Sequence, residues 1–482
     1  MGALYDVAVI GGGPAGLTAA SIGARHALAT VLFDEQPTLG GQIYRGVDKS
    51  SAFRSQIVGG EYRRGVALIE ALRQSGATVV SDASVWAIER RSDEPQGFFD
   101  VGVTYGSASV REVRFVQARA IILATGALER PFPIPGWTLP GVLSAGAAQI
   151  LLKAHGVVAE GNVVLAGTGP LLWLLARQYL DAGVAIAALL DTTPRRQRWQ
   201  SMRNALDFAV SPYFRRGLAL VQSVRKRVRV VRNVTGLEAS GPDRLETIRY
   251  DAGGATHALS ADLLLLHQGI VPDLNLSSAM GCAYRWSEAQ ACFVPVIDAW
   301  GGTSLPDVFI AGDAAGIIGA EAAEARGHLA ALAVANALGR IDAKARDAAA
   351  EAPRAALVRA SRGRAFIDAI YRPADPYRIP QGATVVCRCE GVKAQEIVDA
   401  TKAGAPGPNQ VKAFLRCGMG PCQGRYCGLT VTELIAHERK APPDEIGYFK
   451  LRWPAKPITL GELASLPGSA PATAAVVRNA PH

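Results

Sequence analysis

The N-terminal segment carries the pattern that most restricts how this chain can fold. A β-rich apolar run, residues 5–10, leads into the turn Gly11-Gly12-Gly13-Pro14-Ala15-Gly16, and an alanine-rich helical stretch follows to Arg25. A second apolar run, residues 29–33, ends at Asp34. Strand, glycine turn, helix, strand and acid in this order predict a dinucleotide-binding βαβ unit. The glycines permit a tight turn and a close approach of phosphates to the helix N-terminus, and we expect the acid to accept a hydrogen bond from a ribose hydroxyl.

The same pattern recurs in the middle of the chain. Residues 161–166 are followed by Gly167-Thr168-Gly169-Pro170-Leu171-Leu172, by a helical stretch and by an apolar strand that ends at Asp191. Leu172 stands at the third glycine position, where we expect it to push helix and strand apart. Two interpretations stay open: an NAD site, or a domain that keeps the dinucleotide-binding shape without the ligand.

Two further strands bracket this second unit. Residues 120–126 form an apolar run that ends in Ala124-Thr125-Gly126, and a proline-rich crossover follows. Residues 303–313 end in Gly312-Asp313 before a helix of small residues. Ligands of open α/β sheets bind beyond the carboxyl ends of the strands, so Asp313 is a candidate to bind a ligand hydroxyl.

The cysteines are clustered. None of the seven precedes Cys282, and five lie between Cys387 and Cys427. A disulfide framework would be spread more evenly, so the clustering indicates a metal or iron–sulfur site in a reducing compartment. The Cys-x-Cys pair at 387–389 and the irregularly spaced cysteines at 417, 422 and 427 can supply four thiolates, which favours a [2Fe–2S] cluster, with zinc and then structural thiols as the alternatives. We expect Cys282 and Cys292 to be small buried side chains.

The net charge of +9 is concentrated in one segment. Residues 195–232 contain eleven basic residues and a single acid, Asp207. The alternation in residues 224–230 predicts a strand with Arg225, Arg227 and Arg229 on one face. Such a face is either a solvated strand edge or a docking site for an acidic partner or a flavin phosphate. Binding of nucleic acid is disfavoured because no recognition motif accompanies the charge.

Nothing in the chain predicts insertion into a membrane. No run of eighteen apolar residues is present, so we expect no transmembrane helix. The N-terminus has no signal-peptide pattern. We therefore expect a cytoplasmic protein, with contact to a membrane only through an electron acceptor as the alternative.

Together, the two glycine turns, the Ala-Thr-Gly strand and the Gly-Asp pair resemble the two-dinucleotide-fold flavoproteins related to pyridine-nucleotide–disulfide oxidoreductases. That resemblance covers about residues 5–340 and implies FAD as cofactor. It implies these FAD-binding positions: Gly11, Gly13, Pro14, Ala15, Gly16, Asp34, Glu35, Gln36, Gly41, Gln42, Ala124, Thr125, Gly126, Gly312 and Asp313. No Cys-x-x-Cys or Cys-x4-Cys occurs in this range, which excludes a redox-active disulfide and a thioredoxin- or glutathione-reductase activity.

The cysteine-rich segment resembles the [2Fe–2S] domain of bacterioferritin-associated-ferredoxin type. On that match Cys387, Cys389, Cys422 and Cys427 are ligands and Cys417 is a fifth, structural thiol. The combination with the flavoprotein core is similar to the alpha (A) subunits of the opine oxidase, D-hydroxyproline dehydrogenase and hydrogen cyanide synthase type.

This family resemblance implies an electron-transfer subunit of a hetero-oligomer. A beta subunit with its own flavin would oxidise an amino acid, imino acid or opine, and a small third subunit and an FMN at a subunit interface are further options. The residues identify no catalytic acid or base. Two alternatives stay open: a self-sufficient NAD(P)H-dependent reductase that uses the second glycine turn, and a redox-sensing protein that is not an enzyme.

The predicted fold class is α/β, with two Rossmann-like three-layer dinucleotide-binding domains of glutathione-reductase type and a small, mainly helical [2Fe–2S] domain. We expect an FAD domain in two pieces, 1–155 and 266–340, around an NAD-like domain, 156–265. A helical linker, 341–379, then leads to the cluster domain, 380–440, and to a tail, 441–482, whose residues from 465 on are expected to be mobile.

Overall fold

The first sheet is built around the N-terminal glycine turn. The computed structural model describes residues 4–91, 97–107 and 110–466. Strands β3 (Thr78–Val80), β2 (Thr30–Phe33), β1 (Leu4–Ile10), β6 (Val110–Leu123), β5 (Phe98–Ser107) and β4 (Ala83–Arg91) form the sheet in that order, and β19 (Val308–Ile310) pairs with β6. The strands β1, β2, β3 and β19 are parallel to β6, whereas β4 and β5 are antiparallel additions.

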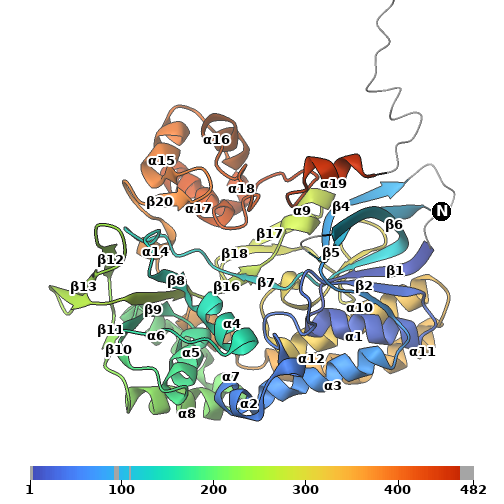
Figure 1. The fold of residues 1–482 in the computed structure, drawn as a ribbon, viewed down its shortest axis with the longest axis horizontal. Coiled ribbons are helices and arrows are strands. Elements are labelled where there is room, and N and C mark those ends of the chain that lie inside the picture. Colours follow the sequence, from blue (N-terminus) through green and yellow to red (C-terminus); the bar gives the residue numbers. More distant parts are fainter. Residues whose placement is uncertain (1–3, 92–96, 108–109, 467–482) are drawn as a thin grey trace, which may run out of the picture.

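Helices cover one face of this sheet (Figure 1). The helices α1 (Pro14–Arg25), α3 (Arg64–Arg73) and α10 (Ala320–Ala337) pack on the side chains of Val9, Leu32 and Ile122, which are almost fully buried. The opposite face is buried as well, with Ala8, Ile10 and Val31 in a second cluster, and burial on both faces explains why β1 and β2 read as continuous apolar runs.

The second sheet has the order β11 (Val230–Arg232), β10 (Ile186–Asp191), β9 (Val163–Thr168), β15 (Leu263–Gln268) and β8 (Val142–Ser144), all parallel. One face is covered by α4 (Ala145–His155), α5 (Pro170–Asp181) and α8 (Tyr213–Arg225). The other carries the antiparallel strands β12 (Gly236–Ser240), β13 (Thr247–Ala252) and β14 (Ala255–Ser260). The short strands β7 (Ala127–Glu129) and β16 (Ile270–Pro272) pair where the chain crosses between the sheets.

Two expectations about this middle segment need correction. Residues 224–230 do not form a strand with three arginines on one face: α8 continues to Arg225, and β11 begins only at Val230. Val224 near the end of α8 and Val228 in the turn that follows are both buried in the core beside α5, so packing ends the helix here and leaves no strand before β11. The strand β8 pairs with β15, so it and α4 belong with the second sheet, and the division lies before β8 rather than at residue 155.

The C-terminal third is helical. The linker contains α11 (Ala343–Ala349), α12 (Glu351–Ser361), α13 (Arg364–Ile370) and α14 (Asp375–Arg378). The cysteine-rich unit follows with β20 (Val385–Cys387), β21 (Val392–Lys393), α15 (Ala394–Lys402), α16 (Pro408–Leu415), α17 (Gly428–Arg439) and α18 (Pro443–Ile446). These findings confirm the predicted fold class.

The cysteine-rich unit extends past residue 440, where the sequence pattern predicts its end. Ile446, Phe449 and Leu451 are buried in its own core. From there a C-terminal strap, residues 452–466, returns to the first sheet, where the Ala455 N–H donates to the carbonyl of Trp86 at 2.8 Å. The strap ends with α19 (Leu460–Ala464), and residues 467–482 lie outside the described part of the chain. Across the described ranges, no helix has the length and apolar character needed to span a membrane.

Candidate functional site

The first glycine turn fixes the start of α1 against the end of β6. Gly11 has φ of +110°, and a side chain on Gly11 would collide with the carbonyl of Ala124. A side chain on Gly16 would collide with the carbonyl of Gly11. Only glycine therefore lets β1, the turn and helix α1 close on one another and on the Ala124-Thr125-Gly126 segment.

Two further predicted motifs meet the same helix end. A Cβ atom on Gly41 would lie 2.7 Å from the Cα of Gly13, and one on Gly312 would lie 2.7 Å from the Cβ of Ala15. Four segments that are far apart in the sequence thus converge on the N-terminus of α1. A helix N-terminus surrounded by close backbone suits the pyrophosphate of a dinucleotide, so this cradle fits FAD.

Two acids follow β2: Asp34 is buried and Glu35 is exposed. Asp34 is 7% exposed, and its carboxylate accepts the backbone N–H groups of Gly12, at 2.5 Å, and Gln36, at 2.7 Å. Asp34 thus closes the glycine turn. The exposed acid is Glu35, which forms an ion pair with Lys456 of the C-terminal strap. Burial lowers the pKa of Lys456 to about 8. Sequence reasoning could not find this lysine, because it lies more than four hundred residues away from Glu35.

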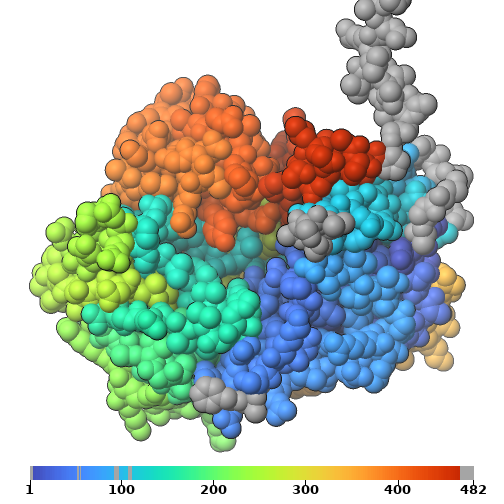
Figure 2. All heavy atoms as spheres, viewed as in Figure 1, coloured from blue at the N-terminus to red at the C-terminus, as the bar shows by residue number. Residues whose placement is uncertain are grey.

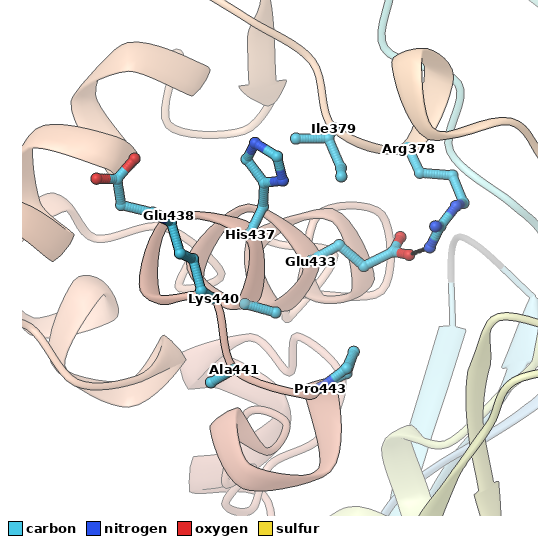
Figure 3. Close-up of a pocket in the computed structure, with 9 residues that line it drawn as sticks. Arg378, Ile379, Glu433, His437, Glu438, Lys440, Ala441 and Pro443 are labelled. Carbon is cyan, nitrogen blue, oxygen red and sulfur yellow. Dashed lines mark hydrogen bonds and ion pairs between the residues drawn. The ribbon is translucent and has the colours of Figure 1, made fainter.

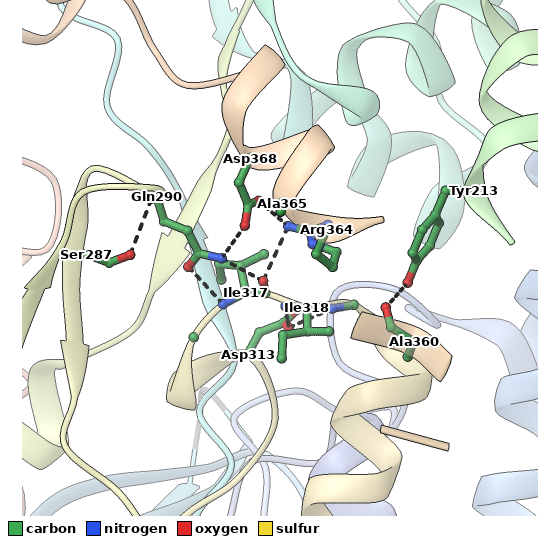
Figure 4. Close-up of polar contacts among 12 residues, drawn as sticks. Tyr213, Ser287, Gln290, Asp313, Ile317, Ile318, Ala360, Arg364, Ala365 and Asp368 are labelled. Carbon is green, nitrogen blue, oxygen red and sulfur yellow. Dashed lines mark hydrogen bonds and ion pairs between the residues drawn. The ribbon is translucent and has the colours of Figure 1, made fainter. Parts of the chain in front are cut away.

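Asp313 organises the loop before α10 (Figure 4). One of its carboxylate oxygens accepts the N–H groups of Ile318 and Gly319, both at 3.1 Å. Arg326 donates to the carbonyls of Gly312 and Gly316 at 3.0 and 2.7 Å. Gln290 also holds the loop: its side-chain N–H donates to the carbonyl of Ile317, and its side-chain oxygen accepts the N–H of Ile317.

A buried lysine stands behind the predicted Gln42 position. Lys153 of α4 donates to the side chain of Gln149 at 2.9 Å and lies 3.4 Å from the carbonyl oxygen of Gln42. Burial lowers the pKa of Lys153 to about 8. The contact joins the loop that contains Gly41 and Gln42 to helix α4 of the second sheet.

The second glycine turn carries a buried leucine at its third glycine position. Gly167 and Gly169 have φ of +135° and +118°, and Leu172 turns into the core, where it is fully buried. The Asp191 carboxylate, at the position expected for a ribose acid, accepts the N–H of Thr193 and pairs with Arg198 at 2.7 Å. The core therefore accommodates the Leu172 side chain, and the acid already has protein partners.

All five clustered cysteines lie within the C-terminal unit. The sulfur atoms of Cys387, Cys417 and Cys427 are within 4.8 Å of one another, and all three residues are buried. Hydrogen bonds from Cys417 and Cys427 lower the pKa of Cys387, and the same contacts raise the pKa of Cys417 and Cys427, so the three thiols form one hydrogen-bonded group. Cys389 is exposed and lies beside Cys422, whose backbone N–H it accepts. The donor set fits an iron–sulfur cluster, but the close group contains Cys417, predicted as a structural thiol, and does not include the predicted ligands Cys389 and Cys422.

The cysteine-rich loop is bonded directly to the crossover segment. Asn275 donates to the carbonyl of Gln423 at 3.1 Å. Arg425 lies close enough to the partly buried Asp273 to lower its pKa against the larger, opposite effect of burial. Asp273 in turn donates its N–H to the carbonyl of Gly126 at 3.0 Å. A short chain of contacts therefore runs from the predicted flavin site to the cysteine loop.

A buried ion network ties α17 to the core. Glu433 lies between Arg130, at 3.7 Å, and Arg378, and burial raises the pKa of Glu433 while both arginines lower it. Arg130 also donates to the carbonyls of Gln290 and Ala291. Figure 3 shows Glu433 reaching from α17 toward Arg378 at the edge of a surface pocket of about 500 Å³. The lining of this pocket also includes His437, Glu438 and Lys440.

The glycine cradle yields a direct test. Gly16→Ala should lower the affinity for FAD by at least about tenfold, or ~1.4 kcal/mol, because the methyl group cannot fit against the Gly11 carbonyl. Gly217→Ala is the matched control, since no atom lies within 4 Å of its added methyl. Flavin content and FAD titration of the apoprotein measure the effect, and equal FAD affinity in both variants would contradict the cradle.

The fold and this site define a flavoprotein of the oxidoreductase class with two dinucleotide-binding folds and an iron–sulfur domain. The pyridine nucleotide-disulphide oxidoreductase family matches residues 5–337, and the BFD-like [2Fe-2S] binding domain matches residues 385–437. The chain belongs to this oxidoreductase family, and within it to the family of the opine oxidase A subunits. FAD and a [2Fe–2S] cluster are accordingly its cofactors, which confirms the predicted pair and decides against zinc.

The relatives cover the chain almost completely. The opine oxidase A chain of Agrobacterium tumefaciens (strain Ach5) is 44% identical over 99% of this chain and 95% of its own length. The HcnB chain of hydrogen cyanide synthase from Pseudomonas protegens is 30% identical over 93% of this chain and 95% of its own. Among solved structures, L-proline dehydrogenase from P. horikoshii has a TM-score of 0.70 at 20% identity, over 96% of this chain and 79% of that one, a likeness in fold alone. The predicted resemblance is confirmed.

Proposed function

We propose that this chain is the electron-transfer subunit of a multi-subunit oxidoreductase that oxidises the C–N bond of an amino acid, imino acid or opine. Substrate oxidation takes place on a flavin of a partner beta subunit, and this chain passes the electrons on. A small third subunit, an interface FMN and a cytoplasmic location belong to the same proposal. Its substrate class comes from the names of the relatives, which are subunits of an opine oxidase and of hydrogen cyanide synthase.

One structural observation carries the relay. Two contacts connect the cysteine loop to the flavin cradle. Asn275 donates to the carbonyl of Gln423 in the cysteine loop, and Asp273 donates its N–H to the carbonyl of Gly126 beside the cradle. A flavin accepts electrons in pairs, whereas a [2Fe–2S] cluster carries them singly, so two adjacent carriers in one chain suit the division of an electron pair. The residues that hold them are the predicted FAD positions around α1 and, for the cluster, Cys387, Cys389, Cys422 and Cys427.

The described residues supply structure rather than acid–base chemistry at the crossover. His267, which lies near the end of β15, is 1% exposed, and its Nδ1 lies 2.6 Å from the Glu129 carboxylate. Glu129 also accepts the N–H of Gly146. This pair therefore fixes β7 and α4, and a substrate-oxidising site is expected on the partner.

Separating the subunits tests this function. The purified chain alone should show no turnover of an opine or imino acid with an artificial acceptor, and adding the partner should restore it. The flavin and cluster absorbance of this chain should bleach only when both proteins and substrate are present. Full turnover by the isolated chain would overturn the proposal, and rapid bleaching by NADH alone would support a self-sufficient reductase instead.

A further inference from the structure

The helices that follow strand β10 of the second sheet expose large apolar side chains on one face. Residues 195–209 form a continuous helical stretch: α6 (Arg195–Ser201), a 3-10 turn (Met202–Asn204) and α7 (Ala205–Ala209). Trp199, Met202, Leu206 and Val210 are 79%, 58%, 87% and 69% exposed. Their spacing of three to four residues puts them in one stripe on the outer side. Soluble proteins seldom leave such a stripe in contact with water, so it indicates a binding surface.

The inner side of this stretch is firmly packed. The ring of Phe208 stacks on Phe366 of the linker helix α13, with centroids 4.2 Å apart. The carboxylate of Asp207 accepts the N–H of Gly363 at 2.6 Å, and Ser201 is fully buried. The stripe is therefore held outward by a rigid base and is not the accidental face of a loose helix.

The rim of the stripe is basic. Arg195, Arg196 and Arg203 are exposed beside it, and the neighbouring helix α8 adds Arg215 and also Arg216, which is ion-paired with Glu61. The T-shaped contact of Phe208 with Phe214 joins the two helices, and α8 contributes Phe214 and Leu218, both more than a third exposed. Asp207, the one acid of residues 195–232, is already bonded to the linker. The surface thus has an apolar centre and a positive border.

The chemistry of this surface selects its partner. Trp, Phe, Met and Arg are the residues enriched at the centres of protein–protein interfaces, where Lys is depleted, and the five basic residues of the rim are all arginine. Arginine suits planar, bidentate contacts with carboxylates. A second copy of this chain would bring two positive faces together, which costs free energy. A protein surface with an apolar centre and an acidic border would complement both the apolar stripe and its arginine rim.

We propose that this arginine-rimmed stripe, made of Trp199, Met202, Leu206, Val210 and Arg195, Arg196 and Arg203, is a docking surface for an acidic partner protein. We identify that partner with the substrate-oxidising subunit, and this identification rests on the proposed function. Its matching surface has an apolar groove for Trp199 and Leu206 bordered by aspartate and glutamate. In Figures 1 and 2, α7 and α8 lie along the edge away from the cysteine-rich unit, so docking here leaves that unit free for an electron acceptor.

The experiment compares two exposed leucines. The complex is purified from the source cells, its subunits are identified by mass spectrometry and separated, and the Kd for their re-association is measured. Leu206→Glu should weaken re-association by at least about tenfold, as truncations of interface hot spots do. Leu460→Glu is the control, because Leu460 is 85% exposed on α19, outside this surface. Arg195→Glu combined with Arg203→Glu should slow association and reduce its dependence on salt.

Each outcome has one meaning. Unchanged flavin and cluster absorbance in every variant shows that folding is intact. An unaltered Kd for Leu206→Glu overturns the docking surface and leaves the proposed function standing. Binding of the wild-type chain to vesicles with anionic lipids that Leu206→Glu abolishes, with affinity for the partner unchanged, makes the surface a membrane contact and also overturns the proposal. Absence of any second protein in the purified complex overturns both.

Discussion

Cys422→Ala should abolish the iron–sulfur cluster. The thiolate of Cys422 is one of four predicted ligands, and a cluster with a missing thiolate is not retained. Iron should fall from roughly two atoms per chain toward zero, and the EPR signal of the reduced protein should disappear. Cys389→Ala should have the same effect, because Cys389 is also a predicted ligand and lies beside Cys422, whose backbone N–H it accepts. The flavin content should stay unchanged in both, since the cradle around α1 contains no cysteine.

Two matched substitutions sharpen this test. Cys282→Ala removes a thiol that is buried in the core of the first sheet and should leave the iron content unchanged. Cys417→Ala should keep the cluster but shift its EPR spectrum, because the Cys417 sulfur lies within 4.8 Å of those of Cys387 and Cys427. Loss of iron in Cys417→Ala together with retention in Cys389→Ala would instead assign Cys417 as a ligand.

Glu433→Ala should produce the largest loss of stability among single substitutions at the junction of the core and the cysteine-rich unit. It removes the carboxylate between Arg130 and Arg378, whose side chains are 4% and 9% exposed. Breaking a buried ion pair leaves an uncompensated charge and costs about 3–5 kcal/mol. Urea unfolding of the cofactor-loaded chain, followed by flavin fluorescence and by cluster absorbance, measures the change. Both signals should shift together, because Arg130 belongs to the crossover and Glu433 to the helix after Cys427.

The control is a carboxylate on the same helix. Glu438 pairs with Lys402 at 3.8 Å at the surface, so Glu438→Ala should cost less than about 1 kcal/mol. Glu433→Gln should fall between the two, because the amide keeps the volume but not the charge. A shift of equal size for Glu433→Ala and Glu438→Ala would contradict the assignment of the buried network.

Much of the fold could be predicted because its signals are local. A turn that only glycine can form, a period of two or of 3.6, and close cysteine spacing are all encoded within a few dozen residues. Gly11, Gly16 and Gly312 belong to such local patterns, and the structure shows the collisions that any side chain there would cause. Boundaries are harder to predict: residues 224–230 alternate as a strand does, yet Val224 and Val228 pack as a helix end and turn against α5.

The local pattern does not show the surroundings of a residue. Leu172 stands at a glycine position, and only the structure shows that its side chain is fully buried in the core beside α5. Asp34 is expected at a ribose, and the structure adds that its carboxylate accepts the N–H groups of Gly12 and Gln36. Both depend on neighbours that the sequence does not place.

Two dinucleotide-binding folds, a flavin core and a cysteine cluster follow from the amino-acid sequence, because each is encoded in contiguous residues whose geometry requires particular side chains or, at the glycines, no side chain. Tertiary structure alone decided the pairing of Lys456 with Glu35, the burial of Glu433 between Arg130 and Arg378, and the outward stripe of Trp199 and Leu206. Contacts across hundreds of residues leave no local period. An amphipathic helix has the same pattern whether its apolar face meets the core or a partner, so only packing reveals which face is left open.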